Sequence, residues 1–198
     1  RNWQLRVIWA VFMDMGAIAP PAGYDGARYV EETAEAVEAK ESQIMPRLFG
    51  TDGVRGLANR DLTARLALDL GDAAVRVLGN SAVREGLPEG RRRALIGRDT
   101  RVSGDFLASA LCAGMSAGGF DVIDAGIIPT PGVAFLTSVL NVEMGAVISA
   151  SHNPMPDNGI KFFARGGFKL PDSKEDDIEA VLGQDWDRPT GAGIGRVS

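Results

Sequence analysis

The chain has 198 residues, of which 45% are hydrophobic and 24% charged, a composition typical of a globular protein and not of a disordered one. Its formal net charge of −5 gives no support to general nucleic-acid binding. No apolar run approaches the roughly 20 residues that span a bilayer. The single cysteine, Cys112, excludes an internal disulfide and favours a reducing, cytoplasmic location.

The two ends of the chain differ in composition from its middle. Residues 16–30 are rich in glycine, alanine and proline, and residues 29–41 are acidic and alanine-rich with almost no apolar stripe to bury. We therefore interpret residues 1–44 as a flexible leader that precedes a domain over residues 45–183. The remaining residues, 184–198, are rich in glycine, aspartate and proline, and we interpret them as a truncated interdomain linker.

Helices and strands are expected to alternate within the domain. In chain order the sequence predicts a helix over 62–78, a strand over 94–97, a helix over 105–117, a strand over 121–125, a helix over 132–140, strands over 144–150 and 160–164, and a helix over 172–182. Gly79 and Asn80 are the expected stop of the first helix, and Ser103 is the expected N-cap of the second. This alternation predicts an α/β domain around a mixed sheet, with ligands bound beyond the carboxyl ends of the strands.

The only histidine of the chain lies in a loop of turn-forming residues, S-A-S-H-N-P-M-P-D-N-G, over residues 149–159. A Ser-His-Asp hydrolase does not fit, because adjacent loop residues seldom point at each other and no G-x-S-x-G elbow is present. The P-loop pattern is also missing. Two interpretations remain: an exposed serine that carries a phosphoryl group on a rigid turn, or an ordinary loop with a surface histidine.

Two further loops carry groups that a phosphate would need. Residues 50–56 place three glycines around an acid and Arg55, and residues 98–104 place Arg98 and Arg101 beside a predicted helix N-terminus. Taken alone, each loop is equally well a solvated turn or a surface cluster of ion pairs. The occurrence of all three loops in one chain favours the phosphoryl-carrying serine.

Four motifs, in this order and roughly this spacing, carry a resemblance to a known family. They are F-G-T-D-G-V-R-G, G-R-D-T-R-V-S-G, P-T-P and S-A-S-H-N-P-M-P-D-N-G-I-K-F-F. Over residues 45–181 the chain resembles the first domain of the α-D-phosphohexomutases, and the wording of the first and last motifs points to their glucosamine branch. The family's later motifs, a D-G-D-G-D-R metal loop, a G-E-x-S-G-H sugar loop and an R-x-S-G-T-E-P phosphate clamp, are absent from the chain.

The resemblance implies an intramolecular phosphotransferase of the isomerase class. It would interconvert glucosamine 6-phosphate and glucosamine 1-phosphate through a 1,6-bisphosphate, for UDP-N-acetylglucosamine and cell-wall synthesis. By the same resemblance Ser151 is the phosphorylated serine, and His152, Lys161 and Arg55 are further catalytic residues. The side chains that it implies as phosphate contacts are Arg98, Arg101 and Asn153.

The implied cofactor is Mg²⁺, held through phosphorylated Ser151 and by carboxylates of a domain that the chain lacks, so we expect the isolated chain to be inactive. The implied partners are a hexosamine phosphate and the remaining mutase domains, with a homodimer as a further option; neither nucleic acid nor a membrane is expected. Two alternatives stay open. One is a phosphomannomutase or phosphoglucomutase of the same superfamily, and the other is a non-catalytic α/β module that binds an anion or a partner.

Overall fold

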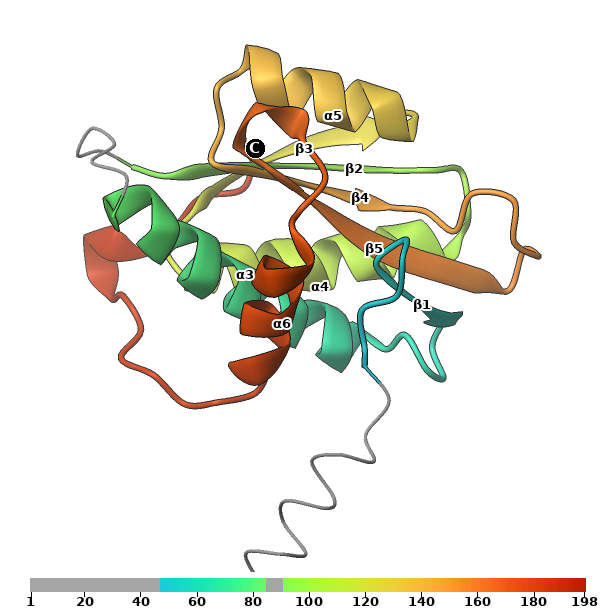
Figure 1. Ribbon diagram of the computed structural model, residues 1–198, viewed down its shortest axis with the longest axis horizontal. Coiled ribbons are helices and arrows are strands. Elements are labelled where there is room, and N and C mark those ends of the chain that lie inside the picture. The colour runs from blue at the N-terminus through green and yellow to red at the C-terminus, as the bar shows by residue number, and fades with distance from the viewer. Residues whose placement is uncertain (1–46, 85–90) are drawn as a thin grey trace, which may run out of the picture. The chain divides into compact units, whose positions relative to one another are not determined.

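A computed structural model describes residues 47–84 and 91–198 of the chain (Figure 1). The leader expected over residues 1–44 lies outside the described residues. From Leu48 onward the chain builds a five-stranded sheet covered by helices. Within the described ranges no helix is both long and apolar enough to cross a membrane.

The sheet is mixed, with the strand order β1-β5-β4-β2-β3. Its strands are β1 (Val54–Leu57), β2 (Arg93–Arg98), β3 (Asp121–Ile127), β4 (Met144–Ile148) and β5 (Asp157–Ala164). Strand β2 runs parallel to β3 and to β4, whereas β5 runs antiparallel to β4 and to β1. The predicted α/β class with a mixed sheet is therefore confirmed.

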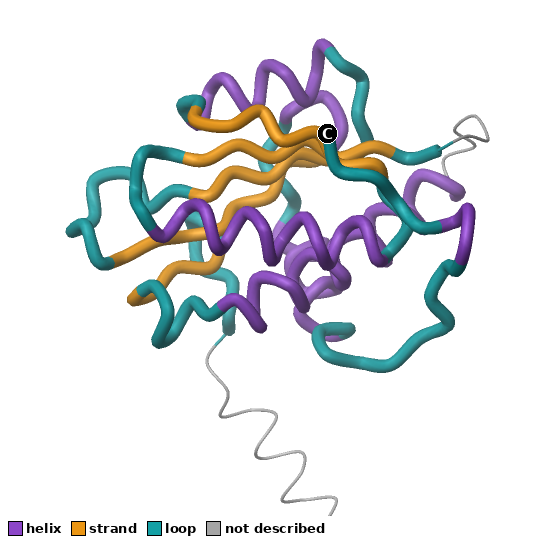
Figure 2. Tube along the Cα trace, turned by 180° about the vertical axis from the view of Figure 1, so that it is seen from behind, coloured by secondary structure: helices purple, strands orange, loops and turns teal. Residues whose placement is uncertain are grey.

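Helices cover both faces of the sheet (Figure 1, Figure 2). They are α3 (Ala64–Arg84), α4 (Ser103–Ala117) and α6 (Asp172–Ala180) on one face, and α5 (Thr130–Val139) on the other. Along β2, Ala94 and Ile96 pack in the core beneath α3 and α4, while Leu95 packs with α5, as the two-residue period of a strand requires. Strand β4 is buried at all five positions, which explains its uninterrupted apolar sequence.

The first helix runs past its predicted stop. Helix α3 continues through Gly79 and Asn80 to Arg84, so the predicted end is wrong. Gly79 is buried against Phe120, and a Cβ atom on this glycine would lie 3.3 Å from the Phe120 ring. The glycine thus serves a close packing contact inside the helix and does not end it.

The predicted N-cap, Ser103, is instead the first residue of α4. Val102 stands before it, without a side-chain cap hydrogen bond. The hydroxyl of Ser103 accepts a hydrogen bond from Asn158 Nδ2 at 2.9 Å, and Asn158 is buried in β5, so this bond ties the start of α4 to the sheet. Strand β5 begins at Asp157, earlier than predicted, because its first residues pair with β1, a short strand that we assigned to a glycine-rich loop.

Two glycines let α3 and α4 cross with their backbones nearly touching. A Cβ atom on Gly114 would lie 2.1 Å from the carbonyl oxygen of Leu68, and one on Gly71 would lie 2.6 Å from that of Leu111. Both distances are shorter than real Cβ contacts, so no side chain fits at either position without moving a helix.

We predict that Gly114→Ala destabilises the chain by about 1–3 kcal/mol, the usual cost of overpacking, although alanine favours a helix by about 1 kcal/mol. The matched control is Ala113→Gly at the exposed neighbouring position, which should cost only the propensity term of about 1 kcal/mol. Urea unfolding followed by circular dichroism measures both changes. A Gly114→Ala variant as stable as the parent chain would show that the helices can separate freely.

The segment predicted as a linker, 184–198, packs along the domain. Val197 pairs in parallel with Val122 of β3. The amide of Val122 donates to the carbonyl of Arg196 at 2.7 Å, and the amide of Ser198 donates to the carbonyl of Val122 at 3.0 Å. The last residues therefore continue the sheet beyond β3.

A carboxylate at the start of β3 holds this segment. Arg91 donates two hydrogen bonds to Asp121, at 2.6 and 2.8 Å, and the amide of Arg196 donates a third at 2.8 Å. Arg91 also donates to the carbonyl oxygens of Ala192 and Ile194, both at 2.8 Å. The hydrogen bonds from Arg91 lower the pKa of Asp121 to about 2, with a smaller contribution from the Arg196 amide.

We predict that acid releases the segment. The folded pKa of Asp121 is about 2 and that of an unfolded aspartate about 3.9, so the stabilisation is fully present above about pH 4 and is lost as the pH falls through about 2. Hydrogen exchange at the Ser198 amide, corrected for its intrinsic pH dependence, should accelerate across this window. The variant Asp121→Asn should show no such acceleration, and a parent chain that also shows none would contradict the prediction.

Candidate functional site

The loop between β4 and β5 presents Ser151 at an exposed turn. Ser151 has a φ of 55°, in the left-handed region that few residues other than glycine adopt. Its amide donates to Ser149 Oγ at 3.0 Å, and the amide of Asn153 donates to the carbonyl of Ala150 at 3.0 Å. Its hydroxyl lies 3.3 Å from His152 Nδ1, which within the described part of the chain is the hydroxyl's only polar contact.

The hydroxyl of Ser149 is already engaged. It donates to Asp99 Oδ2 at 2.8 Å and accepts the hydrogen bond from the Ser151 amide. The backbone amide of Asp99 in turn donates to the carbonyl of Ile148 at 3.0 Å. Of the two serines in the motif, Ser151 is therefore the one with an available hydroxyl.

Arg101 lies against the backbone of the same loop. Its Nε donates to Asp99 Oδ2 at 3.1 Å. Its remaining acceptors are four loop carbonyl oxygens at 2.6–3.1 Å, those of Ser151, Asn153, Pro154 and Asp157. The sequence suggested that Arg101 contacts phosphate, whereas the structure places its guanidinium on the loop itself.

Two cations from neighbouring strands flank the loop. Arg55 of β1 donates from Nη1 to Asn153 Oδ1 at 3.2 Å and pairs with Asp52 at 3.3 Å. Lys161 of β5 lies 3.8 Å from the same carboxylate of Asp52. Because Arg55 stands opposite Gly159, two residues before Lys161, both cations extend from one face of the sheet. The structure thus brings the two expected catalytic cations to one carboxylate, Asp52, and Arg55 also contacts the serine loop.

The two other polar residues of the loop differ in how they are held. Asn153, predicted as a phosphate contact, accepts from Arg55 and donates from Nδ2 to Asp157 Oδ2 at 3.1 Å, so both ends of its amide are engaged. His152 is exposed beside Ser151. Its imidazole is therefore open to a ligand that approaches the serine.

Two glycines allow these segments to meet. Gly53 has a φ of 85°, and a Cβ atom on it would lie 2.3 Å from the carbonyl oxygen of Ile160. A Cβ atom on Gly159 would lie 2.8 Å from the carbonyl oxygen of Ser149, whose amide donates to the Gly159 carbonyl at 2.9 Å. The glycines of both motifs are thus required by close approach of one backbone to another.

Comparison with known proteins identifies the family. Residues 46–187 match the phosphoglucomutase/phosphomannomutase family, in the part described as alpha/beta/alpha domain I. The chain belongs to this family. A solved member, a phosphoglucomutase/phosphomannomutase family protein from Burkholderia thailandensis, shares the fold with a TM-score of 0.58 and 28% sequence identity, over 77% of this chain and 32% of that one.

Two curated relatives carry the same name. The chain is 90% identical over 154 residues to a phosphoglucosamine mutase of Bifidobacterium longum (strain DJO10A), covering 78% of this chain and 33% of the relative. It is 59% identical over 152 residues to a phosphoglucosamine mutase of Acidothermus cellulolyticus, covering 77% of this chain and 32% of the relative. The chain thus spans about a third of the length of these relatives.

The remaining arginine of the second family motif turns away from the serine loop. Arg98 Nε pairs with Asp105 of α4 at 2.9 Å, and its Nη1 pairs with Asp124 of β3 at 3.2 Å. Both partners lie beside a hollow that Cys112 also lines. Burial, reinforced by Asp124, raises the pKa of the Cys112 thiol to about 11. Arg98 thus contacts α4 and β3, whereas Arg55 contacts the serine loop.

The described residues contribute little to a metal site. Within residues 47–84 and 91–198, no three His, Cys, Asp or Glu side chains are placed to hold an ion together. The loop's own carboxylate, Asp157, accepts from Asn153, while Asp99 accepts from Ser149 and Arg101. These two carboxylates are engaged in holding the loop. The metal ligand that this part of the chain has available is therefore an oxygen on Ser151.

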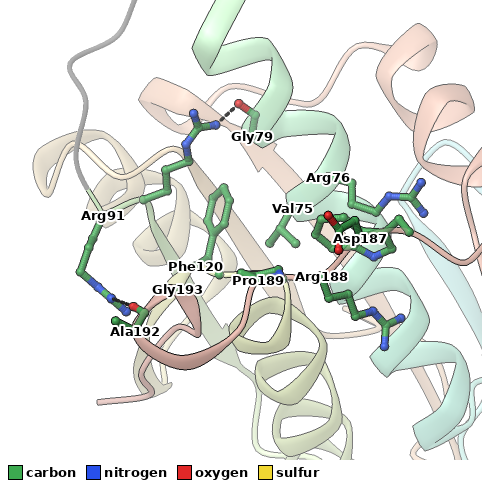
Figure 3. A pocket seen from close by; sticks show the side chains of 14 residues that line it. Val75, Arg76, Gly79, Arg91, Phe120, Asp187, Arg188, Pro189, Ala192 and Gly193 are labelled. Atoms are coloured by element: carbon green, nitrogen blue, oxygen red, sulfur yellow. Dashed lines mark hydrogen bonds between the residues drawn. The ribbon is translucent and has the colours of Figure 1, made fainter.

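A larger hollow, of about 740 Å³, lies at the other end of the parallel strands, between α3, the end of α4 and residues 186–193 (Figure 3). Its cationic lining residues are Arg76, Arg91, Arg92 and Arg188. Each guanidinium donates to a backbone carbonyl or to a carboxylate. The carboxyl end of a helix also carries negative partial charge, which favours arginines there over a bound anion. We therefore interpret this hollow as a gap between packed segments and not as an anion-binding site.

Proposed function

We propose that the chain is the phosphoryl-carrying domain of a phosphoglucosamine mutase, which interconverts glucosamine 6-phosphate and glucosamine 1-phosphate through a 1,6-bisphosphate. The observation that carries this proposal is the available hydroxyl of Ser151 on a loop in which the hydroxyl of the other serine, Ser149, is engaged. The name that these two relatives carry supports glucosamine over mannose or glucose as the sugar.

The proposed reaction has two half-reactions. In the first, the phosphoryl group on Ser151 Oγ moves to the 1-hydroxyl of the sugar 6-phosphate: a P–O bond to the sugar forms, the bond from phosphorus to Oγ breaks, and the hydroxyl proton passes to a base. Oγ takes up a proton as it leaves. In the second half-reaction the bisphosphate reverses its orientation, Oγ gives up that proton and forms a bond to the 6-phosphorus, and the bond from this phosphorus to the sugar 6-oxygen breaks as the oxygen takes a proton. The product is glucosamine 1-phosphate, a precursor for UDP-N-acetylglucosamine.

Phosphoryl transfer depends on positioning and charge neutralisation more than on a strong base. His152, with Nδ1 3.3 Å from the Ser151 hydroxyl, is placed to exchange a proton with Oγ. Arg55 and Lys161 would leave the Asp52 carboxylate, at 3.3 and 3.8 Å, for the more highly charged phosphate. We assign all three as catalytic residues beside Ser151.

A Mg²⁺ ion would fit this proposal with Ser151 as one ligand, through an oxygen of its phosphate, and with carboxylates from outside the described residues. When bound, it would neutralise part of the charge on the transferred group. The proposal includes a cytoplasmic location, which the single, buried and unpaired Cys112 supports.

We predict that Ser151 and not Ser149 carries the phosphate. In the full-length enzyme, Ser151→Ala should abolish both phosphorylation and turnover. Ser149→Ala should retain the phosphate on Ser151 but lose activity by roughly fivefold, since one hydrogen-bonded hydroxyl is worth about 1 kcal/mol. Phosphopeptide mapping and a coupled assay for glucosamine 1-phosphate measure the two effects.

Parallel assays with glucosamine, mannose and glucose phosphates, together with the phosphopeptide map, separate the alternatives. If mannose or glucose phosphates are turned over in preference to glucosamine phosphate, the assignment of Ser151 as carrier stands and the assignment of the sugar is refuted. Phosphate found on Ser149 alone, or full activity in Ser151→Ala, would refute the assignment of the carrier. A full-length protein with neither phosphate nor turnover would favour a non-catalytic module.

A further inference from the structure

The guanidinium of Arg101 has no donor left for a ligand. An arginine side chain carries five N–H groups in one plane. In Arg101 all are used: Nε on Asp99 at 3.1 Å, Nη1 on the carbonyls of Pro154 and Asp157 at 2.6 and 3.1 Å, and Nη2 on the carbonyls of Ser151 and Asn153 at 3.1 and 2.8 Å. The side chain is 9% exposed.

We infer that Arg101 is a positioning residue that holds the serine loop in its working conformation, and that it does not bind the phosphate of the substrate. The inference rests on the proposed function, because the working conformation is the one in which Ser151 carries the phosphoryl group. The contacts of Arg101 do not depend on that function. Four carbonyls that span residues 151–157 converge on one rigid fork, so the loop's backbone path is fixed from a single side chain.

A second set of bonds carries this control to Ser151 itself. The Arg101 amide donates to Asp99 Oδ1 at 3.0 Å, and Asp99 Oδ2 accepts from the Ser149 hydroxyl at 2.8 Å. That hydroxyl accepts the Ser151 amide at 3.0 Å. The left-handed backbone of Ser151, at a φ of 55°, is therefore held from both sides: its amide through Ser149 and its carbonyl by Arg101.

Arg55 shows what an arginine available to a ligand looks like in the same site. Its side chain is 28% exposed, and its Nη2 pairs with the exposed carboxylate of Asp52 at 3.3 Å, a partner outside the serine loop that an anion can replace. A phosphate could gain a hydrogen bond from Arg55 without breaking the loop. To reach Arg101, the phosphate would have to displace a carbonyl and deform the turn that presents Ser151.

Lysine cannot replace Arg101, because an ammonium has three donors and no planar fork. We expect Arg101→Lys in the full-length enzyme to lower kcat by about 100-fold, the loss that a displacement of about 1 Å can cause. The KM for the sugar phosphate should change by less than about threefold, because no ground-state contact is removed. In Arg101→Ala, added guanidinium ion should restore part of kcat.

Hydrogen exchange of the 149–158 peptide gives a readout that does not depend on activity. It should accelerate in Arg101→Lys and, less strongly, in Ser149→Ala. The matched control is Arg76→Lys, since Arg76 also donates to two backbone carbonyls, those of Val181 and Gln184, but in another part of the domain. This control should leave both loop exchange and kcat unchanged.

Three results would overturn the inference. The first is a kcat and a loop exchange that are both unchanged in Arg101→Lys, and the second is a KM raised tenfold or more in that variant with kcat retained. The third is an acceleration of loop exchange in the Arg76→Lys control as large as that in Arg101→Lys. If Arg101→Ala does not fold, the Arg101→Lys and Ser149→Ala variants still decide between these results. Failure of the proposed function is a separate outcome. It would appear as absent turnover in the unmodified enzyme, with loop exchange still responding to Arg101→Lys.

Discussion

The parallel pairing of β2 with β4 is the constraint on which the site depends. In this register Arg98 stands opposite Ile148, and the next amide, that of Asp99, donates to the Ile148 carbonyl at 3.0 Å. Parallel strands end at the same edge, so the two loops leave the sheet side by side. The contact of Asp99 with Ser149 and the contacts of Arg101 with the loop backbone follow from this placement. A slip of one residue would turn every side chain of one strand to the opposite face and separate them.

The pattern of apolar residues in the sequence was enough to predict most helices and strands. Buried positions recur every three to four residues in a helix, and in a strand they alternate or form an unbroken apolar run. It was not enough for β1, since four residues inside a glycine-rich motif carry no period and form a strand only through pairing with β5. The site was predicted in part. The motif placed Ser151, but an arginine beside a helix start looks the same in the sequence whether it meets a phosphate or a carbonyl. The acceptors of Arg101 lie about 50 residues further along the chain, and only the fold brings them to it. The part played by Asp99 was missed for the same reason.

Charge is arranged in two layers around the serine loop. In the inner layer, Asp99 pairs with Arg101, and both are consumed in holding the backbone. In the outer layer, Asp52 pairs with Arg55 and Lys161 at longer distances, with a carboxylate that is 54% exposed. Exposed ion pairs contribute little to stability and are readily exchanged for another anion. The exposure of each pair thus distinguishes the less exposed pair of Asp99 and Arg101, which holds the loop backbone, from the more exposed pairs of Asp52.

The pairing of Val197 with Val122 has a consequence for how copies of the domain meet one another. The unpaired backbone groups of a border strand are a template on which a second chain can add, and this is a common route to aggregation. Here the outer side of β3 is occupied by the chain's own residues, through the bonds of Val122 with Arg196 and Ser198. The other border strand, β1, has only four residues. The sheet therefore has very little unpaired edge strand with which a neighbouring sheet could form hydrogen bonds. This protects the domain against edge-to-edge pairing at high concentration.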